Sequence, residues 1–170
     1  MCIRDSFFDN YGDCNTLPYG LVIEGAVSNL DGLSGLERIN GSLTLESGVL
    51  ESIGGLSSLR VIEGRLRVAN SKLTSLAGLE SLVQLGSLSL EENRSLVEIN
   101  ALSGIAGPFG TVNIYRNRLL QTIDGLAGIT SINGSLSIDG ESTLTDLNAF
   151  ISLESISGSL TLQNLSLIHI

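Results

Sequence analysis

The sequence has few of the side chains on which enzyme chemistry depends. Its 170 residues contain no tryptophan, one histidine, one methionine and two cysteines, and aromatic residues make up 4% of the chain. No apolar run approaches the roughly 20 residues that a membrane helix needs. Lysine and arginine number 9 against 18 aspartates and glutamates, which gives a net charge of −9. This acidic balance argues against nucleic acid or an anionic membrane as the main partner.

The only methionine, the only histidine and one of the two cysteines lie at the two ends of the chain, in the hexapeptides MCIRDS and LSLIHI. One set of codons for LSLIHI has the reverse complement GATGTGTATAAGAGACAG, and that strand, read from its second base, encodes Met-Cys-Ile-Arg-Asp. The two ends therefore translate as opposite strands of one short DNA element, which resembles the mosaic-end adapter of transposase-based sequencing libraries. We expect residues 1–6 and 165–170 to be adapter artefacts and leave them out of the fold.

The remaining chain fits one domain with a sizeable core. We expect residues 7–20 to form an N-terminal lead-in and residues 21–164 a single repeat domain, cut from a longer chain. A signal peptide or membrane anchor would then lie outside this fragment. Without the two ends there is no histidine and no cluster of metal ligands, so zinc and nucleophilic catalysis lack their parts and no cofactor is expected. Cys14 is either a buried thiol or half of a disulfide whose partner was cut away.

A repeat of 22 to 24 residues organises the chain. The motif Gly-x-(Leu/Val)-x-(Leu/Val/Ile) alternates apolar and other residues, which predicts a short strand with one buried face. A degenerate first copy covers residues 21–23, so about six to seven coils are expected. The full copies begin at Gly41, Gly64, Gly86, Gly110, Gly134 and Gly158.

Between these strands the apolar residues follow a step of three. An α-helix turns about 100° per residue, so this step would carry the apolar residues around most of its circumference. The spacing instead favours short strands, bends and single 3₁₀ turns that keep pointing at a shared interior. Asparagines just after the strands suit tight corners with a left-handed backbone; they are Asn70, Asn93, Asn117 and Asn164. The pattern predicts an all-β solenoid whose coils bury their leucines and isoleucines against one another.

The segments NLDGLSGLERINGSLTL (29–45) and IDGLAGITSINGSLSI (123–138) carry a family resemblance. Over residues 14–164 the chain resembles the receptor L-domain family and its microbial relatives with leucine-rich surface repeats. The resemblance implies a right-handed β-solenoid of cell-surface or wall proteins that binds ligands, contributes to adhesion or serves as a structural module, without enzyme activity. Cys14 resembles a cysteine of the family's N-terminal capping region, although no partner for it is visible. The alternative fold is a leucine-rich-repeat horseshoe, whose outline residues 85–96 fit.

Strands that stack in register would arrange their outward residues in columns with about 4.8 Å between coils. Two adjacent outward columns consist mainly of serine and threonine, which raises the possibility of ice binding. Arg65 interrupts one column, and Arg67 and Asn113 interrupt the other. A further column holds acids on alternate coils, about 9.6 Å apart. This is wider than the roughly 5 to 9.5 Å between paired carboxylates in glycoside hydrolysis, and the face is expected to be flat, which argues against catalysis. An ice-binding or polysaccharide-processing β-helix remains the alternative function. The acidic column reads Glu46, Ala69, Glu91, Tyr115, Asp139 and Gln163.

Basic residues concentrate on the strand face and the corner beside it, in three consecutive coils. Such a patch could hold an anionic glycan or an acidic partner loop, or it could be solvated charge that keeps exposed strands from associating. The candidate ligand-binding residues are Arg65, Arg67, Arg94, Tyr115, Arg116 and Arg118.

Three asparagines begin an Asn-x-Ser sequence, which is an acceptor for glycosylation in a eukaryotic secreted protein. Two of them also coincide with the junction between coils. They are Asn40, Asn93 and Asn133. The family resemblance therefore implies a non-catalytic extracellular or cell-surface module for recognition, adhesion or structure, with a protein or glycan as its ligand.

Overall fold

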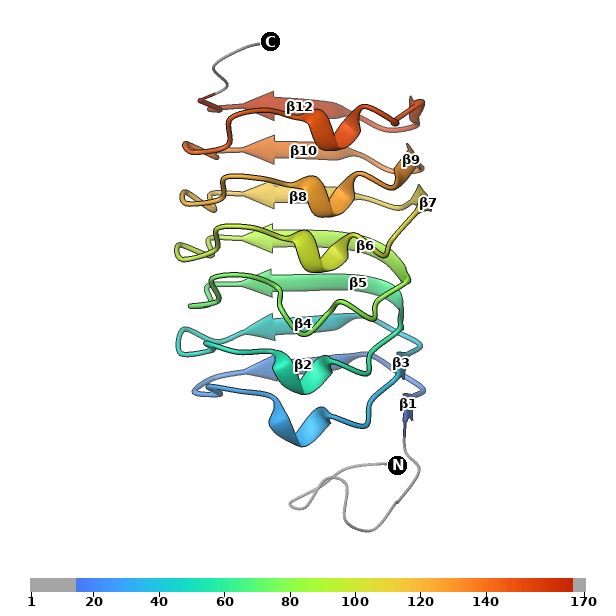
Figure 1. Ribbon diagram of the computed structural model, residues 1–170, viewed down its shortest axis with the longest axis vertical. Coiled ribbons are helices and arrows are strands. Elements are labelled where there is room, and N and C mark those ends of the chain that lie inside the picture. Colours follow the sequence, from blue (N-terminus) through green and yellow to red (C-terminus); the bar gives the residue numbers. More distant parts are fainter. Residues whose placement is uncertain (1–14, 167–170) are drawn as a thin grey trace.

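Parallel β-strands stack along one axis in the computed structural model, which describes residues 15–166 (Figure 1). The predictions about residues 1–6, about Cys14 and about most of 165–170 therefore concern positions outside the described residues. Within the described range the chain contains strands and 3₁₀ turns and no α-helix. The strands are β1 (Thr16–Leu17), β2 (Leu21–Glu24), β3 (Arg38–Ile39), β4 (Leu43–Glu46), β5 (Val61–Ala69), β6 (Gln84–Glu91), β7 (Gly107–Phe109), β8 (Val112–Tyr115), β9 (Ile129–Ile132), β10 (Leu136–Asp139), β11 (Ser155–Ile156) and β12 (Leu160–Gln163).

The strand of each Gly-x-Leu-x-Leu repeat pairs in parallel with the same strand of the next repeat. Leu43 lies opposite Leu66, Leu66 opposite Leu88, and Leu88 opposite Val112. The register continues through β10 to β12. The strands form a nine-stranded sheet and a three-stranded sheet, the latter made of β7, β9 and β11. The predicted in-register stack of parallel strands is therefore confirmed, and the fold is all-β and solenoid-like.

The segments with a step of three return the chain from one strand to the next, and five of them do so through a single 3₁₀ turn, as predicted. The segment between β5 and β6 makes the same return through turns and bends alone. In the second of the 3₁₀ turns Ile53, Leu56 and Leu59 are fully buried. The turn closes by a hydrogen bond from the Leu56 N–H to the Ile53 carbonyl at 2.9 Å. The 3₁₀ turns lie in front of the strands of the large sheet in Figure 1. They are η1 (Asp31–Leu33), η2 (Gly54–Leu56), η3 (Asn100–Leu102), η4 (Asp124–Leu126) and η5 (Asn148–Phe150).

One continuous apolar cluster fills the interior along the stack, from Leu17 to Ala149. Coils approach so closely that some positions admit only glycine. A Cβ atom added at Gly55 would lie 1.7 Å from the carbonyl oxygen of Leu30 on the preceding coil. The repeat glycines therefore reflect stacking distance as much as backbone freedom.

The corner after each large-sheet strand corrects one prediction about the asparagines. Asn70 and Asn164 do have the expected left-handed backbone, with φ of 51° at each. In the coils of Asn93 and Asn117, however, the left-handed residues are Glu92 (φ 53°) and Arg116 (φ 55°). The asparagine comes one residue later in these two coils, so its side chain turns inward and is fully buried.

Candidate ligand-binding surface

Arg67 on β5 joins two acidic residues of the neighbouring strands. Its guanidinium lies 2.6 Å from a carboxylate oxygen of Glu46 and 2.8 Å from one of Glu91. The hydrogen bond and charge of Arg67 hold the pKa of Glu46 below its usual value. Burial raises the pKa of Glu91, but hydrogen bonds from Ser89 and Arg67 and the nearby arginine charges outweigh it, so the net shift is downward. Glu46 and Glu91, two of the acids of the outward column, are thus ionised partners of Arg67, which lies between them.

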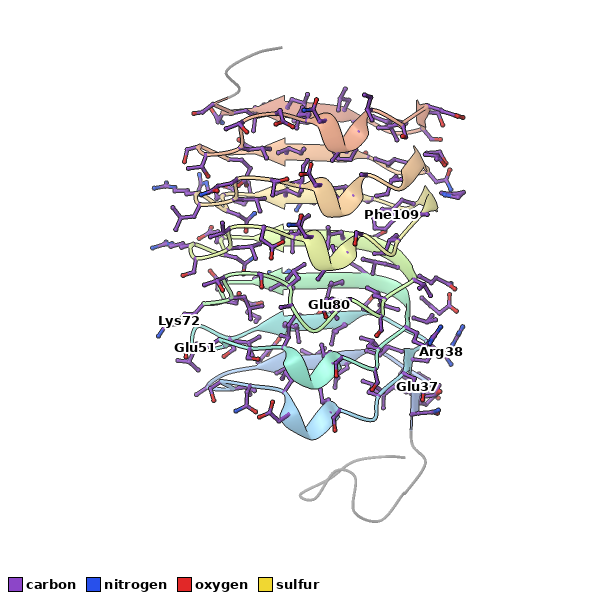
Figure 2. The ribbon with its side chains drawn as sticks, in the orientation of Figure 1. Glu37, Arg38, Glu51, Lys72, Glu80 and Phe109 are labelled. Atoms are coloured by element: carbon purple, nitrogen blue, oxygen red, sulfur yellow. The ribbon has the colours of Figure 1, made fainter. Side chains whose placement is uncertain are left out.

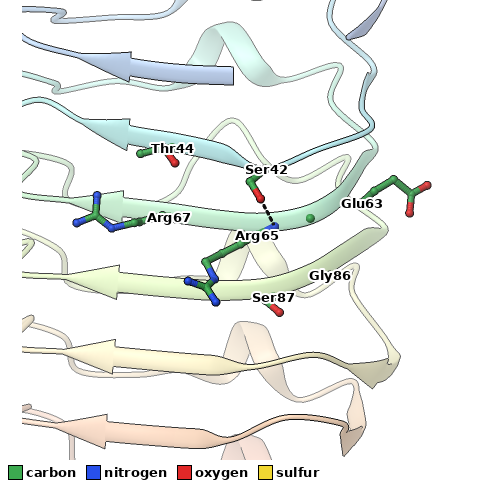
Figure 3. Close-up of a pocket in the computed structure, with 8 residues that line it drawn as sticks. Ser42, Thr44, Glu63, Arg65, Arg67, Gly86 and Ser87 are labelled. Atoms are coloured by element: carbon green, nitrogen blue, oxygen red, sulfur yellow. Dashed lines mark hydrogen bonds between the residues drawn. The ribbon is translucent and has the colours of Figure 1, made fainter. Parts of the chain in front are cut away.

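Arg65, two residues earlier, borders a hollow of about 490 Å³ on the same face (Figure 3). Gly64 and Gly86 form part of its lining, and Ser42 and Ser87 add hydroxyl groups. The Ser42 hydroxyl accepts a hydrogen bond from the Arg65 N–H at 3.0 Å. Glu63 at the rim pairs with Arg38. With Arg67 balanced by two carboxylates, this hollow combines charges of both signs and is not a cationic site.

The corner beside the sheet presents a second depression, which we call the corner groove and define by its lining residues Glu92, Arg94, Arg116 and Arg118. Its volume is about 160 Å³. Arg94 approaches Glu92 only to 4.0 Å. Among the described residues, no carboxylate lies within 4.0 Å of the Arg116 or Arg118 side chain. Three arginines against one glutamate make the groove electropositive on an acidic protein.

Tyr115 supports the groove from the end of β8. The Arg116 guanidinium carbon lies 4.8 Å from the centre of the Tyr115 ring, within the range of a cation–π contact. Lys72, the other basic residue at this edge, approaches Glu51 at 3.7 Å, and Figure 2 shows the two side chains together there. The stacked ring restricts the Arg116 side chain without neutralising it.

The structure therefore divides the predicted basic patch. Arg94, Tyr115, Arg116 and Arg118 gather at the corner groove, as proposed from the sequence. Arg65 and Arg67 line the separate hollow on the strand face. Arg67 is not free to bind a ligand in this structure, because Glu46 and Glu91 on the neighbouring coils both pair with it.

A ladder of buried polar side chains runs beneath the corner groove, and the sequence did not lead us to it. The Asn93 side-chain N–H donates to the Asn117 side-chain oxygen at 3.1 Å, and Ser71 donates from its N–H and hydroxyl to the Asn93 oxygen at 3.1 and 2.7 Å. The Asn117 N–H donates to Glu141 at 2.9 Å. The available signal in the sequence was a polar residue that recurs, in the coils of the ladder, three positions after the second apolar residue of the Gly-x-Leu-x-Leu motif. We call Ser71, Asn93, Asn117 and Glu141 the buried ladder.

Glu141 ends the ladder and is fully buried. Its Oε1 accepts from Asn117, whereas Oε2 has no hydrogen-bond partner among the described residues. Burial raises the pKa of this carboxyl, with the charge of Asp139 adding to the effect and hydrogen bonds from Asn117 opposing it. A buried polar atom without a partner lowers the stability of the fold, so the stability of this corner is expected to depend on the protonation state of Glu141.

The three glycosylation acceptors differ in exposure. Asn40 and Asn133 are exposed at coil junctions. Asn93 is fully buried and occupied by the ladder, so the prediction that it accepts a glycan is wrong for the folded protein. The local sequence Asn-Arg-Ser carries no information about this burial, which depends on pairing with the next coil.

The serine column of the strand face takes part in backbone hydrogen bonds between coils. Hydroxyls of the serine column accept backbone hydrogen bonds from the following coil, as Ser87 does from Thr111 at 3.0 Å. Within residues 15–166 no three histidine, cysteine, aspartate or glutamate side chains gather as a metal site would require. No helix in the same range is long and apolar enough to cross a membrane.

Comparison of the chain with family models, with curated proteins and with solved structures gives no match.

Proposed function

We propose that this chain is a non-catalytic recognition, adhesion or structural module of the receptor L-domain type, located outside the cell or on its surface. In this proposal the fold is a right-handed β-solenoid of about six to seven coils. The ligand is a protein or glycan that carries acidic groups. The corner groove is the observation that carries the proposal, because it concentrates arginine on a protein whose net charge is −9.

The chemistry of the groove suits sulfate or carboxylate groups. Guanidinium groups bind planar or tetrahedral anions through two parallel hydrogen bonds, and such charge-assisted bonds are stronger than neutral ones. Arg94 comes from one coil, and Arg116 and Arg118 come from the next. A ligand that follows the solenoid axis could therefore place one anionic group near each of these two coils. Arg116 is held against Tyr115, which lowers the conformational entropy lost on binding.

A binding array of sulfated glycans, carboxylated glycans and acidic peptides tests the proposal. The variant R94Q/R116Q/R118Q removes the cations of the corner groove. The variant R38Q/R60Q/R65Q removes the same charge from other parts of the chain and is the matched control. We expect the wild-type protein and the control to bind acidic probes and the corner variant to lose that binding. Equal signals from both variants, or no binding to any acidic probe, would rule the proposal out.

A further inference from the structure

We propose that Glu141 is a positioning residue for the corner groove: in its neutral form it completes the buried ladder that holds the groove arginines, and its ionisation weakens the binding of sulfate-bearing ligands. This inference rests on the proposed function of the groove.

The buried ladder and the corner groove are formed by neighbouring residues of the same chain segments. Asn93 stands between Glu92 and Arg94, and Asn117 stands between Arg116 and Arg118. Each asparagine turns into the interior while its neighbours line the groove. The hydrogen bonds of the ladder therefore fix the backbone from which the groove side chains project.

Glu141 is bonded to this backbone directly. Its Oε1 accepts from the Asn117 N–H at 2.9 Å and from the Asn117 side-chain N–H at 3.3 Å. The Asn117 oxygen in turn accepts from the N–H and the side-chain N–H of Asn93, each at 3.1 Å. A change at Glu141 thus reaches the turns of both arginine-bearing coils through two consecutive side chains.

The turn around Glu141 contacts the groove residues on both sides of Asn117. A Cβ atom added at Gly140 would lie 3.0 Å from Cγ of Arg116, so the two turns are in close contact there. The hydroxyls of Ser142 and Thr143 donate to the Arg118 carbonyl at 3.2 and 3.0 Å. Movement of this turn would therefore displace Arg116 and Arg118.

In the two preceding coils a side-chain amide nitrogen of the buried ladder donates to a strand carbonyl of the coil before it, a hydrogen bond that Glu141 does not make. The Asn93 side-chain nitrogen donates to the Val68 carbonyl at 2.9 Å, and that of Asn117 donates to the Leu90 carbonyl at 3.1 Å. The strand register makes Ile114 the equivalent residue for Glu141. A neutral carboxyl can donate one hydrogen bond, as the amides do, whereas a carboxylate can only accept.

In the described part of the chain, the surroundings of Glu141 offer hydrogen bonds from Asn117 but no cation to balance a negative charge. Asp139 on its own coil is acidic, and Arg116 and Arg118 on the preceding coil are exposed and line the groove. The following coil presents Asn164 and Leu165, which carry no charge. Among the described residues no cation forms an ion pair with Glu141. Ionisation would leave a buried, unpaired charge, which favours opening of the turn to water.

Isothermal titration of the whole chain with dextran sulfate between about pH 4 and pH 8 tests this inference, because sulfate esters keep their charge throughout that range. We expect wild-type affinity to fall by about five-fold or more as the pH rises, a size typical of coupling between sites. E141Q keeps the acceptor oxygen and adds a permanent donor, so its affinity should stay at the wild-type low-pH level. E92Q removes the groove's own carboxylate and that group's contribution to the pH dependence, and it should retain the fall in affinity that depends on Glu141.

The outcomes separate this inference from the proposed function. No binding of dextran sulfate by the wild type at any pH would overturn the proposed function, and the inference with it. Binding that has the same pH profile in wild type and E141Q would overturn the inference alone. Circular dichroism of each variant identifies loss of fold, and a folded E141Q that cannot bind at low pH would also contradict the inference.

Discussion

The side-chain amide of Asn93 donates to the side-chain oxygen of Asn117 on the next coil at 3.1 Å, and both residues are fully buried. This contact links two coils through their interiors at the point where the chain leaves the large sheet. Buried amides are stabilising only where their donors and acceptors are paired, and here the neighbouring coils supply the partners. The pair thus fixes the spacing of the two corners that carry Arg94, Arg116 and Arg118.

Truncation of the ladder should destabilise the protein strongly. In N117A, the Asn93 N–H groups and the Leu90 carbonyl lose their partners while remaining buried. With about 1–3 kcal/mol for each buried group left unpaired, we expect unfolding to become easier by about 3 kcal/mol or more, measured by urea denaturation. The exposed N133A is the control and should change stability by less than about 0.5 kcal/mol. Equal stability of the two variants would contradict the structural role of the ladder.

Glycine positions should separate into two classes. G55A places a methyl group 1.7 Å from the Leu30 carbonyl oxygen, so the two coils must move apart at an estimated cost of about 3 kcal/mol. At Gly35 an added Cβ atom meets nothing within 4 Å, so G35A should be close to neutral or slightly stabilising. Thermal unfolding of the two variants provides the measurement. A G55A variant as stable as G35A would show that the coils are not stacked this closely.

The bridge formed by Arg67 should appear in the pH dependence of stability. The pKa values of Glu46 and Glu91 are lowered in the folded state, so their contribution is present above the unfolded pKa and is lost as pH falls through the folded values. R67M should therefore unfold at a lower temperature than the wild type at pH 7, and this difference should shrink toward about pH 2. R65M, which alters a residue outside this bridge, should show a smaller pH-dependent difference. A constant difference for R67M at every pH would refute the bridge.

The stability of E141Q should depend on pH in the opposite direction. The pKa of Glu141 is raised in the folded state, so its favourable contribution is fully present below the unfolded pKa and is lost as pH rises through the folded value. The glutamine variant does not titrate, and its advantage over the wild type should grow with pH, reaching about 1–3 kcal/mol once the carboxyl is ionised. Urea denaturation at a series of pH values measures this. A lower stability of E141Q than of the wild type at high pH would contradict the cost assigned to the ionised, unpaired Glu141 carboxylate.

The parts of the fold that were predictable from the sequence are those encoded within one repeat. The alternation in Leu43 to Leu45 and the step of three from Leu50 to Ile62 depend on residues close together in the chain, and the structure bears out both. The buried ladder and the Arg67 bridge depend on which residues of different coils lie opposite each other. Asn93 and Asn117 come one residue after the left-handed position of their coils, and this offset of one residue places their side chains in the interior instead of at the corner.

The corner groove could be predicted only in part. Counting coils placed Arg94, Arg116 and Arg118 at one edge, and the structure confirms their proximity. The same counting could not show that Arg67 is neutralised, because the Glu46 and Glu91 side chains must cross to the intervening coil to reach it. Side-chain reach and burial, which the periodicity does not contain, decide which arginines remain free.

Residue-level mapping of ligand binding tests the central claim, that the corner groove recognises acidic ligands. A ¹⁵N-labelled sample titrated with a sulfated oligosaccharide of defined length reports on each backbone amide. The proposal predicts saturable shifts at residues 92–94 and 115–118, and their loss in R94Q/R116Q/R118Q. Shifts confined to the strand face around residues 42–67, or no saturable shifts at the corner, would contradict it.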